Sequence, residues 1–126
     1  MNSSPYKGKT GLQRIWNALH YSISGLRSAY THESAFRQEL FLAILMSIAA
    51  LLLPVTSVQL ALLLGSVLLV LITELLNSAI EAVVDRVSFE SHDLAKRAKD
   101  MGSAAVLISL IACVLIWFLV LRDTLR

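Results

Sequence analysis

Three long runs of apolar residues make up most of the chain, and short polar segments separate them. The first lies at about 36–53, the second at about 58–84 and the third at 101–121. An α-helix needs about 20 mostly apolar residues to cross the hydrocarbon core of a bilayer. The pattern therefore predicts an all-α membrane protein with three transmembrane helices. The third run contains no charged residue and is the clearest of the three.

A different pattern precedes these runs, at about 10–31. Apolar residues recur there at spacings of three and four, which is typical of a helix with one apolar face. Arg14, Asn17, His20 and Arg27 lie on the opposite face. We expect an amphipathic helix on the membrane surface, although a helix packed against a neighbour has the same pattern. The apolar positions are Leu12, Ile15, Trp16, Leu19, Ile23, Leu26 and Tyr30.

Composition and charge agree with a membrane protein of one domain, residues 1–126. Apolar residues make up 56% of the chain and charged residues 16%, whereas soluble domains carry about 25% charged residues. The net charge of +2 is too small to indicate nucleic-acid binding. The lone cysteine, Cys113, lies within an apolar run, and we interpret it as a small hydrophobic residue.

The basic residues also predict an orientation. Nine of the eleven lie before the first run, at its start (Arg37), or between the second and third runs, and two follow the third. Because cytoplasmic loops are enriched in lysine and arginine, the N-terminus and the polar connector at 85–100 are expected in the cytoplasm.

The second run carries polar residues that share one helical face. Glu74, Asn77, Ser78, Glu81 and Asp85 follow one another at offsets of 0, 3, 4, 7 and 11. An ionised side chain at the centre of a membrane helix costs about 2.5–3.5 kcal/mol on insertion scales. Glu74 and Glu81 are therefore expected near the cytoplasmic interface, with partners there.

The hairpin of the first two runs indicates what those partners are. Reflection of the chain about the short turn that follows Pro54 brings Glu33 level with Ser78, and Arg37 level with Glu74. Lys99 and Asp100, which come just before the third run, reach the same boundary. Carboxylates and basic side chains are therefore expected together at one depth.

This set of residues is typical of metal-assisted phosphoryl chemistry. Mg²⁺ prefers oxygen ligands and is usually shared between carboxylates and substrate phosphates. A further carboxylate can accept a hydroxyl proton, and basic groups can neutralise phosphoryl charge. The alternative is an interhelical hydrogen-bond network of Glu74, Asn77 and Glu81 that only holds the helices together. The chain has no P-loop and no protein-kinase signature.

Three stretches carry a family resemblance: ESAFRQE at 33–39, ELLNSAIEAVVDR at 74–86 and AKRAKDMGSAAVLI at 95–108. Together they resemble the prokaryotic diacylglycerol kinase family, and the resemblance extends from about Gly11 to Leu121. It implies a homotrimer of three-span subunits in the bacterial inner membrane, each with an N-terminal surface helix. It also implies that MgATP phosphorylates diacylglycerol at the cytoplasmic face, in sites formed between subunits.

The resemblance also implies roles for individual residues. Glu74 resembles the general base, Glu33 and Glu81 the Mg²⁺ ligands, and Asn77 a supporting residue. The implied nucleotide contacts are Arg14, Tyr21, Glu33, Glu81, Glu90, His92, Lys99 and Asp100. The implied lipid contacts are Arg14, Arg27, Ala35, Arg37, Glu74, Ser103 and Trp117.

Two alternative functions remain open from the sequence. An undecaprenol kinase would use the same acidic cluster, because only the lipid tail of the acceptor differs. A non-enzymatic membrane subunit would keep the acidic residues to relay charge. The sequence departs from the expected family pattern at Ile23, Ser24, Tyr30, Phe89 and Ser91, which leaves the base and metal positions intact.

Overall fold

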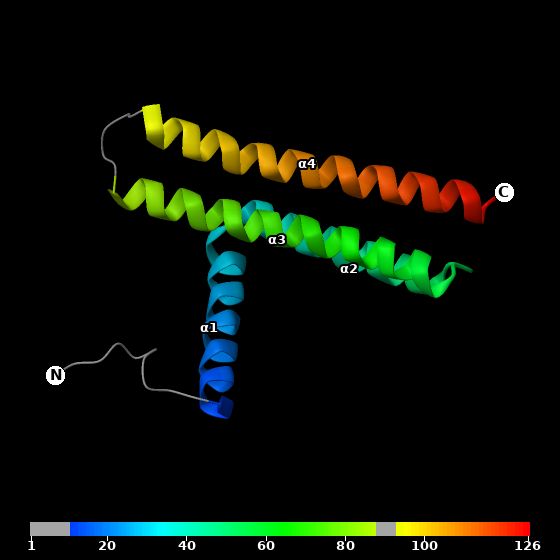
Figure 1. Cartoon of the computed structure of the whole chain (residues 1–126), viewed down its shortest axis with the longest axis horizontal. Helices are drawn as coiled ribbons and strands as arrows, with labels where there is room; N and C mark the ends of the chain where they lie inside the picture. The colour runs from blue at the N-terminus through cyan, green and yellow to red at the C-terminus, as the bar shows by residue number, and fades with distance from the viewer. Residues whose placement is uncertain (1–10, 88–92) are drawn as a thin grey trace.

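A computed structural model describes residues 11–87 and 93–126, and the regular structure within these residues is helical. Helices α2, α3 and α4 lie side by side as an antiparallel bundle, and α1 leaves the bundle at a steep angle (Figure 1). Glu90 and His92, which the sequence assigns to the nucleotide, lie outside the described residues. The four helices are α1 (Gly11–His32), α2 (Ser34–Leu52), α3 (Ser57–Val87) and α4 (Asp93–Thr124).

Helices α2, α3 and α4 are each long and apolar enough to cross a membrane. The predicted all-α architecture with three candidate spans is therefore confirmed. Helices α3 and α4 continue beyond the apolar runs into the polar connector expected at 85–100. Residues 85–87 of this connector belong to α3, and residues 93–100 belong to α4.

The turn between α2 and α3 has clear local causes. Pro54 lacks a backbone N–H and restricts the residue before it, which ends α2. The Thr56 backbone N–H donates to Gln59 Oε1 at 2.9 Å, and the Gln59 backbone N–H donates to Thr56 Oγ1 at 3.1 Å. This reciprocal pair is a capping box, which satisfies donors at the start of α3.

The bundle core is built from small and β-branched residues. The buried residues of α2 are Phe36, Ala43 and Ala50, spaced by seven, which is the spacing that keeps one helix face against its neighbours. Ala50 packs with Leu63 and Val120 near the α2–α3 turn, as a small apolar cluster. A second cluster in the middle of the bundle contains Ala43, Val67, Val70 and Cys113.

Helix α1 meets α2 at a single non-helical residue, Glu33, whose φ of −118° and ψ of 106° are extended. The Glu33 backbone N–H donates to the Ala29 carbonyl at 2.9 Å. Arg37 Nη1 donates to the carbonyl oxygens of Tyr30 at 2.7 Å and Thr31 at 3.2 Å. Arg37 thus satisfies the last carbonyls of α1, which have no helical partner of their own.

Helix α1 makes little contact with the rest of its own subunit. Within Gly11–His32, Ala29 is the one buried residue. The side chains of Leu12, Ile15 and Trp16, for example, are 85%, 65% and 59% exposed. The apolar residues at helical spacing are therefore left uncovered within one subunit.

Candidate active site

A buried carboxylate and a half-buried one lie on the same face of α3. Glu74 is 8% exposed, and Asn77 and Glu81 are half-buried. Asn77 Nδ2 donates a hydrogen bond to Glu81 Oε1 at 3.3 Å. The spacing of four residues explains this pair, because such residues are neighbours on a helix surface. The amide therefore orients the Glu81 carboxylate.

Three other carboxylates lie near Glu74: Glu81 on α3, Glu39 on α2, and Glu33 at the joint between α1 and α2. Reflection of the sequence about the turn predicts Arg37 level with Glu74. In the structure the Arg37 guanidinium donates to carbonyl oxygens at the end of α1, and Glu39 is the α2 residue whose charge lies near Glu74. Sequence reasoning missed Glu39. Its position three residues after Phe36 and four before Ala43, both buried, was a usable signal.

Glu33 lies in a groove of about 640 Å³ between α1 and α3. Its α1 wall includes Leu26, Ala29 and His32, and its α3 wall includes Ser78 and Ala82. Glu33 and Ser78 thus share one groove, which is the pairing that reflection about the turn predicts. Ser78 shares the polar face of α3 with Glu74, Asn77 and Glu81, so Glu33 lies close to that face.

Two ion pairs lie where α3 and α4 approach the polar connector. Lys99 Nζ is 2.7 Å from Asp85 Oδ1, and Lys96 Nζ is 2.7 Å from Asp100 Oδ2. All four side chains are substantially exposed, so these pairs contribute little stability. Their consequence is positional, because the Asp85 pair holds the Lys99 ammonium beside the acidic face of α3.

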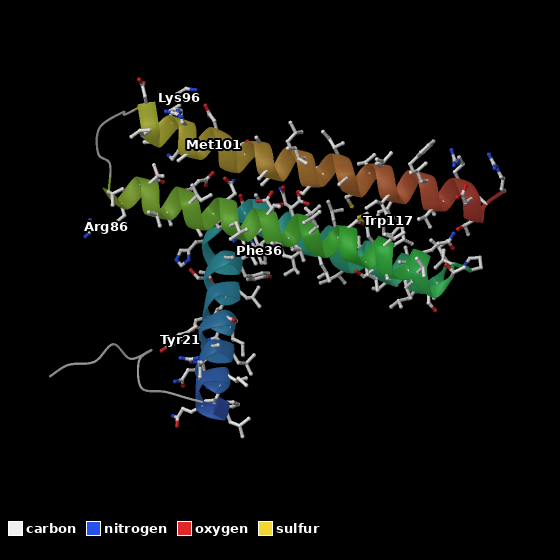
Figure 2. All side chains as sticks on the ribbon, in the orientation of Figure 1. Tyr21, Phe36, Arg86, Lys96, Met101 and Trp117 are labelled. Atoms are coloured by element: carbon white, nitrogen blue, oxygen red, sulfur yellow. The ribbon has the colours of Figure 1, made fainter. Side chains whose placement is uncertain are left out.

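Several sequence-predicted residues lie apart from this cluster. Tyr21 projects sideways from α1, below the bundle in this view, and Trp117 lies toward the opposite end of α4 from Lys96 and Met101 (Figure 2). Trp117 Nε1 donates to Ser66 Oγ at 3.1 Å. The side chains of Arg14, Arg27, Ala35 and Ser103 are exposed. The described residues of the chain therefore do not bring all of the implied nucleotide and lipid contacts together.

The oxygen donors on α3 and at Glu33 have the chemistry of a Mg²⁺ site that is shared with a substrate. Among residues 11–87 and 93–126, no group of three histidine, cysteine or acidic side chains could hold a metal ion alone. Mg²⁺ usually binds through one or two carboxylates together with substrate phosphates and water. Glu33 and Glu81 fit that requirement by donor type.

A small multi-pass helical membrane protein with an acidic site at one end of its bundle is the class that these features define. Comparison with known protein families matches residues 20–121 to the family described as prokaryotic diacylglycerol kinase. The chain belongs to this kinase family, which confirms the resemblance found in the sequence.

Similar proteins cover nearly the whole chain. A diacylglycerol kinase of Pseudomonas aeruginosa is 50% identical over 121 residues, which are 96% of this chain and 98% of that protein. The diacylglycerol kinase of Escherichia coli K12 is 53% identical over 112 residues, 89% of this chain and 92% of that protein. The diacylglycerol kinase of Helicobacter pylori strain 26695 is 46% identical over 113 residues, 90% of this chain and 88% of that protein.

Proposed function

We propose that this protein phosphorylates diacylglycerol to phosphatidic acid, with ATP as the phosphoryl donor. The observation that carries the proposal is the buried Glu74 carboxylate on a candidate membrane helix, in a chain of this kinase family. Glu74 lies in the connector-side half of α3, and in this proposal the lipid hydroxyl reaches it from the bilayer. The carboxylates and the lysine near it are accessible to a nucleotide from the aqueous side.

Glu74 is the proposed general base. Its carboxylate would accept the proton of the lipid hydroxyl as that oxygen attacks the γ-phosphorus of ATP. The reaction forms the new oxygen–phosphorus bond of phosphatidic acid and breaks the bond between the γ-phosphorus and ADP.

Glu81 and Glu33 are the proposed ligands of a divalent cation, which we take to be Mg²⁺. The bound ion would neutralise charge on the ATP phosphates. Asn77 supports Glu81 through its hydrogen bond. Lys99 is near enough to the same face of α3 to attract phosphate oxygens, and Asp100 is proposed as its neighbour in nucleotide binding.

We also propose a homotrimer with sites shared between subunits. Arg14 and Tyr21 are the proposed nucleotide contacts from α1, a helix that leaves the bundle and from which Tyr21 projects sideways (Figure 2). Exposed apolar residues on α1 favour contact with a membrane surface or another subunit. Glu90 and His92 complete the proposed nucleotide contacts. The proposed lipid contacts are Arg14, Arg27, Ala35, Arg37, Glu74, Ser103 and Trp117.

The proposed location is the bacterial inner membrane, with the N-terminus and the connector at 85–100 in the cytoplasm. The excess of lysine and arginine on this side of the apolar runs supports that orientation. The acidic cluster would then face the cytosolic pool of ATP. The whole chain, 1–126, forms one membrane domain in this proposal.

The test is a lipid-alcohol assay on purified protein in detergent. Diacylglycerol, Mg²⁺ and ATP should yield phosphatidic acid, and the Glu74→Gln variant should not. Asp123→Asn, which changes an exposed carboxylate near the other end of α4, is the matched control and should retain activity. Phosphorylation of undecaprenol alone would favour the polyprenol kinase, and no product from folded protein would favour a non-enzymatic subunit.

A further inference from the structure

Gly102 lies in the contact between α4 and the acidic face of α3. It is buried, and it faces Asn77. A Cβ atom added at this position would collide with Asn77 Oδ1 and would lie 3.3 Å from Asn77 Cγ and 3.7 Å from Ile80 Cδ1. The Asn77 carboxamide thus occupies the space that the missing side chain leaves.

Two further facts describe how Asn77 is held. Its Oδ1 atom is buried and has no hydrogen-bond partner among the described residues. Its Nδ2 atom donates to Glu81 Oε1 at 3.3 Å. A buried carbonyl oxygen without a partner is unfavourable, so this orientation persists only because surrounding atoms hold the carboxamide in place. Close approach of α4 at Gly102 supplies that constraint.

Among the described glycines that lie inside helices, Gly102 alone has a neighbour that an added Cβ would meet. Gly25 and Gly65 also lie inside helices, and an added Cβ at either would meet no described atom within 4 Å. Glycine destabilises a helix interior relative to alanine. A local steric requirement therefore explains a buried glycine inside a helix and in contact with a polar side chain. At Gly102 that requirement is the room needed by the Asn77 side chain.

We propose that Gly102 is a positioning residue for the kinase reaction. It leaves room for one orientation of the Asn77 carboxamide, with Oδ1 toward α4 and Nδ2 toward Glu81, and so orients the Glu81 carboxylate. Gly102 contacts neither substrate nor cation in this proposal. The inference rests on the proposed function, in which Glu81 is a ligand of the divalent cation.

The first test is a Mg²⁺ titration of the kinase activity of Gly102→Ala. Loss of a group that orients a metal ligand typically costs about 10–100-fold in metal affinity, so the half-saturating Mg²⁺ concentration should rise by about that factor. The KM for diacylglycerol should stay unchanged. Gly65→Ala is the matched control and should behave as the parent protein. An unchanged Mg²⁺ titration of Gly102→Ala would overturn the proposal.

The second test needs neither metal nor substrate. Thermal unfolding of the metal-free protein should show a lower midpoint for Gly102→Ala, and addition of Asn77→Ala should restore part of the loss, because it empties the crowded space. If Gly102→Ala alone does not accumulate, the double variant should accumulate. A double variant as unstable as Gly102→Ala, or as poorly accumulated, would overturn the proposed contact.

A double-mutant cycle separates this inference from the proposed function. In the Asn77→Ala background, Gly102→Ala should produce no further change in the Mg²⁺ titration, and additive losses would contradict a role through Asn77. If Asn77→Ala itself leaves the titration unchanged, the proposed role of the Asn77–Glu81 pair fails. If Asn77→Ala weakens Mg²⁺ binding and Gly102→Ala does not, the inference alone fails.

Discussion

The two ends of the bundle use the same three helices for different purposes. At the turn end, where α2 meets α3, Ala50, Leu63 and Val120 form a packed apolar cluster. At the connector end, polar pairs lie beside apolar contacts: Asn77 bonds Glu81 within α3, and Asp85 pairs with Lys99 across α3 and α4. Apolar packing holds the helices together at the turn end. The connector end also holds the carboxylates to which the proposed reaction is assigned.

Hydrogen bonds between α3 and α4 connect the two ends. Ser66 Oγ accepts a hydrogen bond from Trp117 Nε1 at 3.1 Å, and Thr73 Oγ1 lies 2.8 Å from Ser109 Oγ. The pair that lies nearer the C-terminus of α3 lies nearer the N-terminus of α4, as antiparallel helices require. They fix the axial register of the two helices and so help determine which residue of α4 faces Asn77.

The largest effect is expected from the connector end. Glu74→Gln should lower kcat by about 10²–10⁴-fold, because the amide cannot accept the hydroxyl proton. Initial-rate assays with saturating substrates measure this loss. The thermal midpoint should not fall, since burying a neutral amide is cheaper than burying a carboxylate. Near-parental kcat would remove Glu74 as the base.

A change at the turn end should affect stability instead. Leu63 is fully buried, and Leu63→Ala should lower the free energy of unfolding by about 2–5 kcal/mol, as core truncations do. Unfolding in mixed micelles measures the loss. The neighbouring Leu62 is 47% exposed, so Leu62→Ala is the control and should cost much less. If Leu63→Ala changed kcat without changing stability, the division between the two ends would be wrong.

Glu81→Gln and Glu33→Gln should raise the Mg²⁺ requirement. A shift of about 10–100-fold in half-saturating Mg²⁺ is expected for each, because changes to groups that bind or orient a metal cost that much. A titration at constant ATP measures it, with Asp123→Asn again as the control. A curve identical to that of the parent protein would count against either residue as a ligand.

The smallest effect is expected between the two ends. A double-mutant cycle of Ser109→Ala with Thr73→Ala should give a coupling energy of about 0.6 kcal/mol, the average that such cycles give for interhelical hydrogen bonds in a membrane protein. The Mg²⁺ titration should be unchanged. A coupling energy near zero would show that the register depends on packing alone.

Much of the fold could be predicted from local pattern. The three candidate spans follow from runs of apolar residues, and the shared face of Glu74, Asn77 and Glu81 follows from helical geometry alone. The sequence also placed Glu33 level with Ser78, which lines the same groove. These features depend on spacing along one helix or across one short turn.

Features that depend on the relation between helices could not be predicted in the same way. The hydrogen bond from Arg37 Nη1 to a carbonyl oxygen at the end of α1 depends on the angle between α1 and α2. The contact of Gly102 with Asn77 depends on which face of α4 is turned toward α3. The proposed meeting of Arg14 and Tyr21 with a nucleotide depends on the proposed trimer, and no pattern within one chain specifies how its subunits would be arranged.

The single extended residue between α1 and α2 has a mechanical consequence. Helix α1 has 22 residues, so at 1.5 Å per residue it is a rigid arm about 33 Å long. A rotation of about 10° at Glu33 would move the far end of that arm by about 6 Å, by this length. Arg14 lies near that far end, whereas Glu33 is at the pivot. The hydrogen bonds from Arg37 to the carbonyl oxygens of Tyr30 and Thr31 therefore restrict rotation at Glu33. A small rotation at Glu33 would produce a much larger displacement at the N-terminal end of α1.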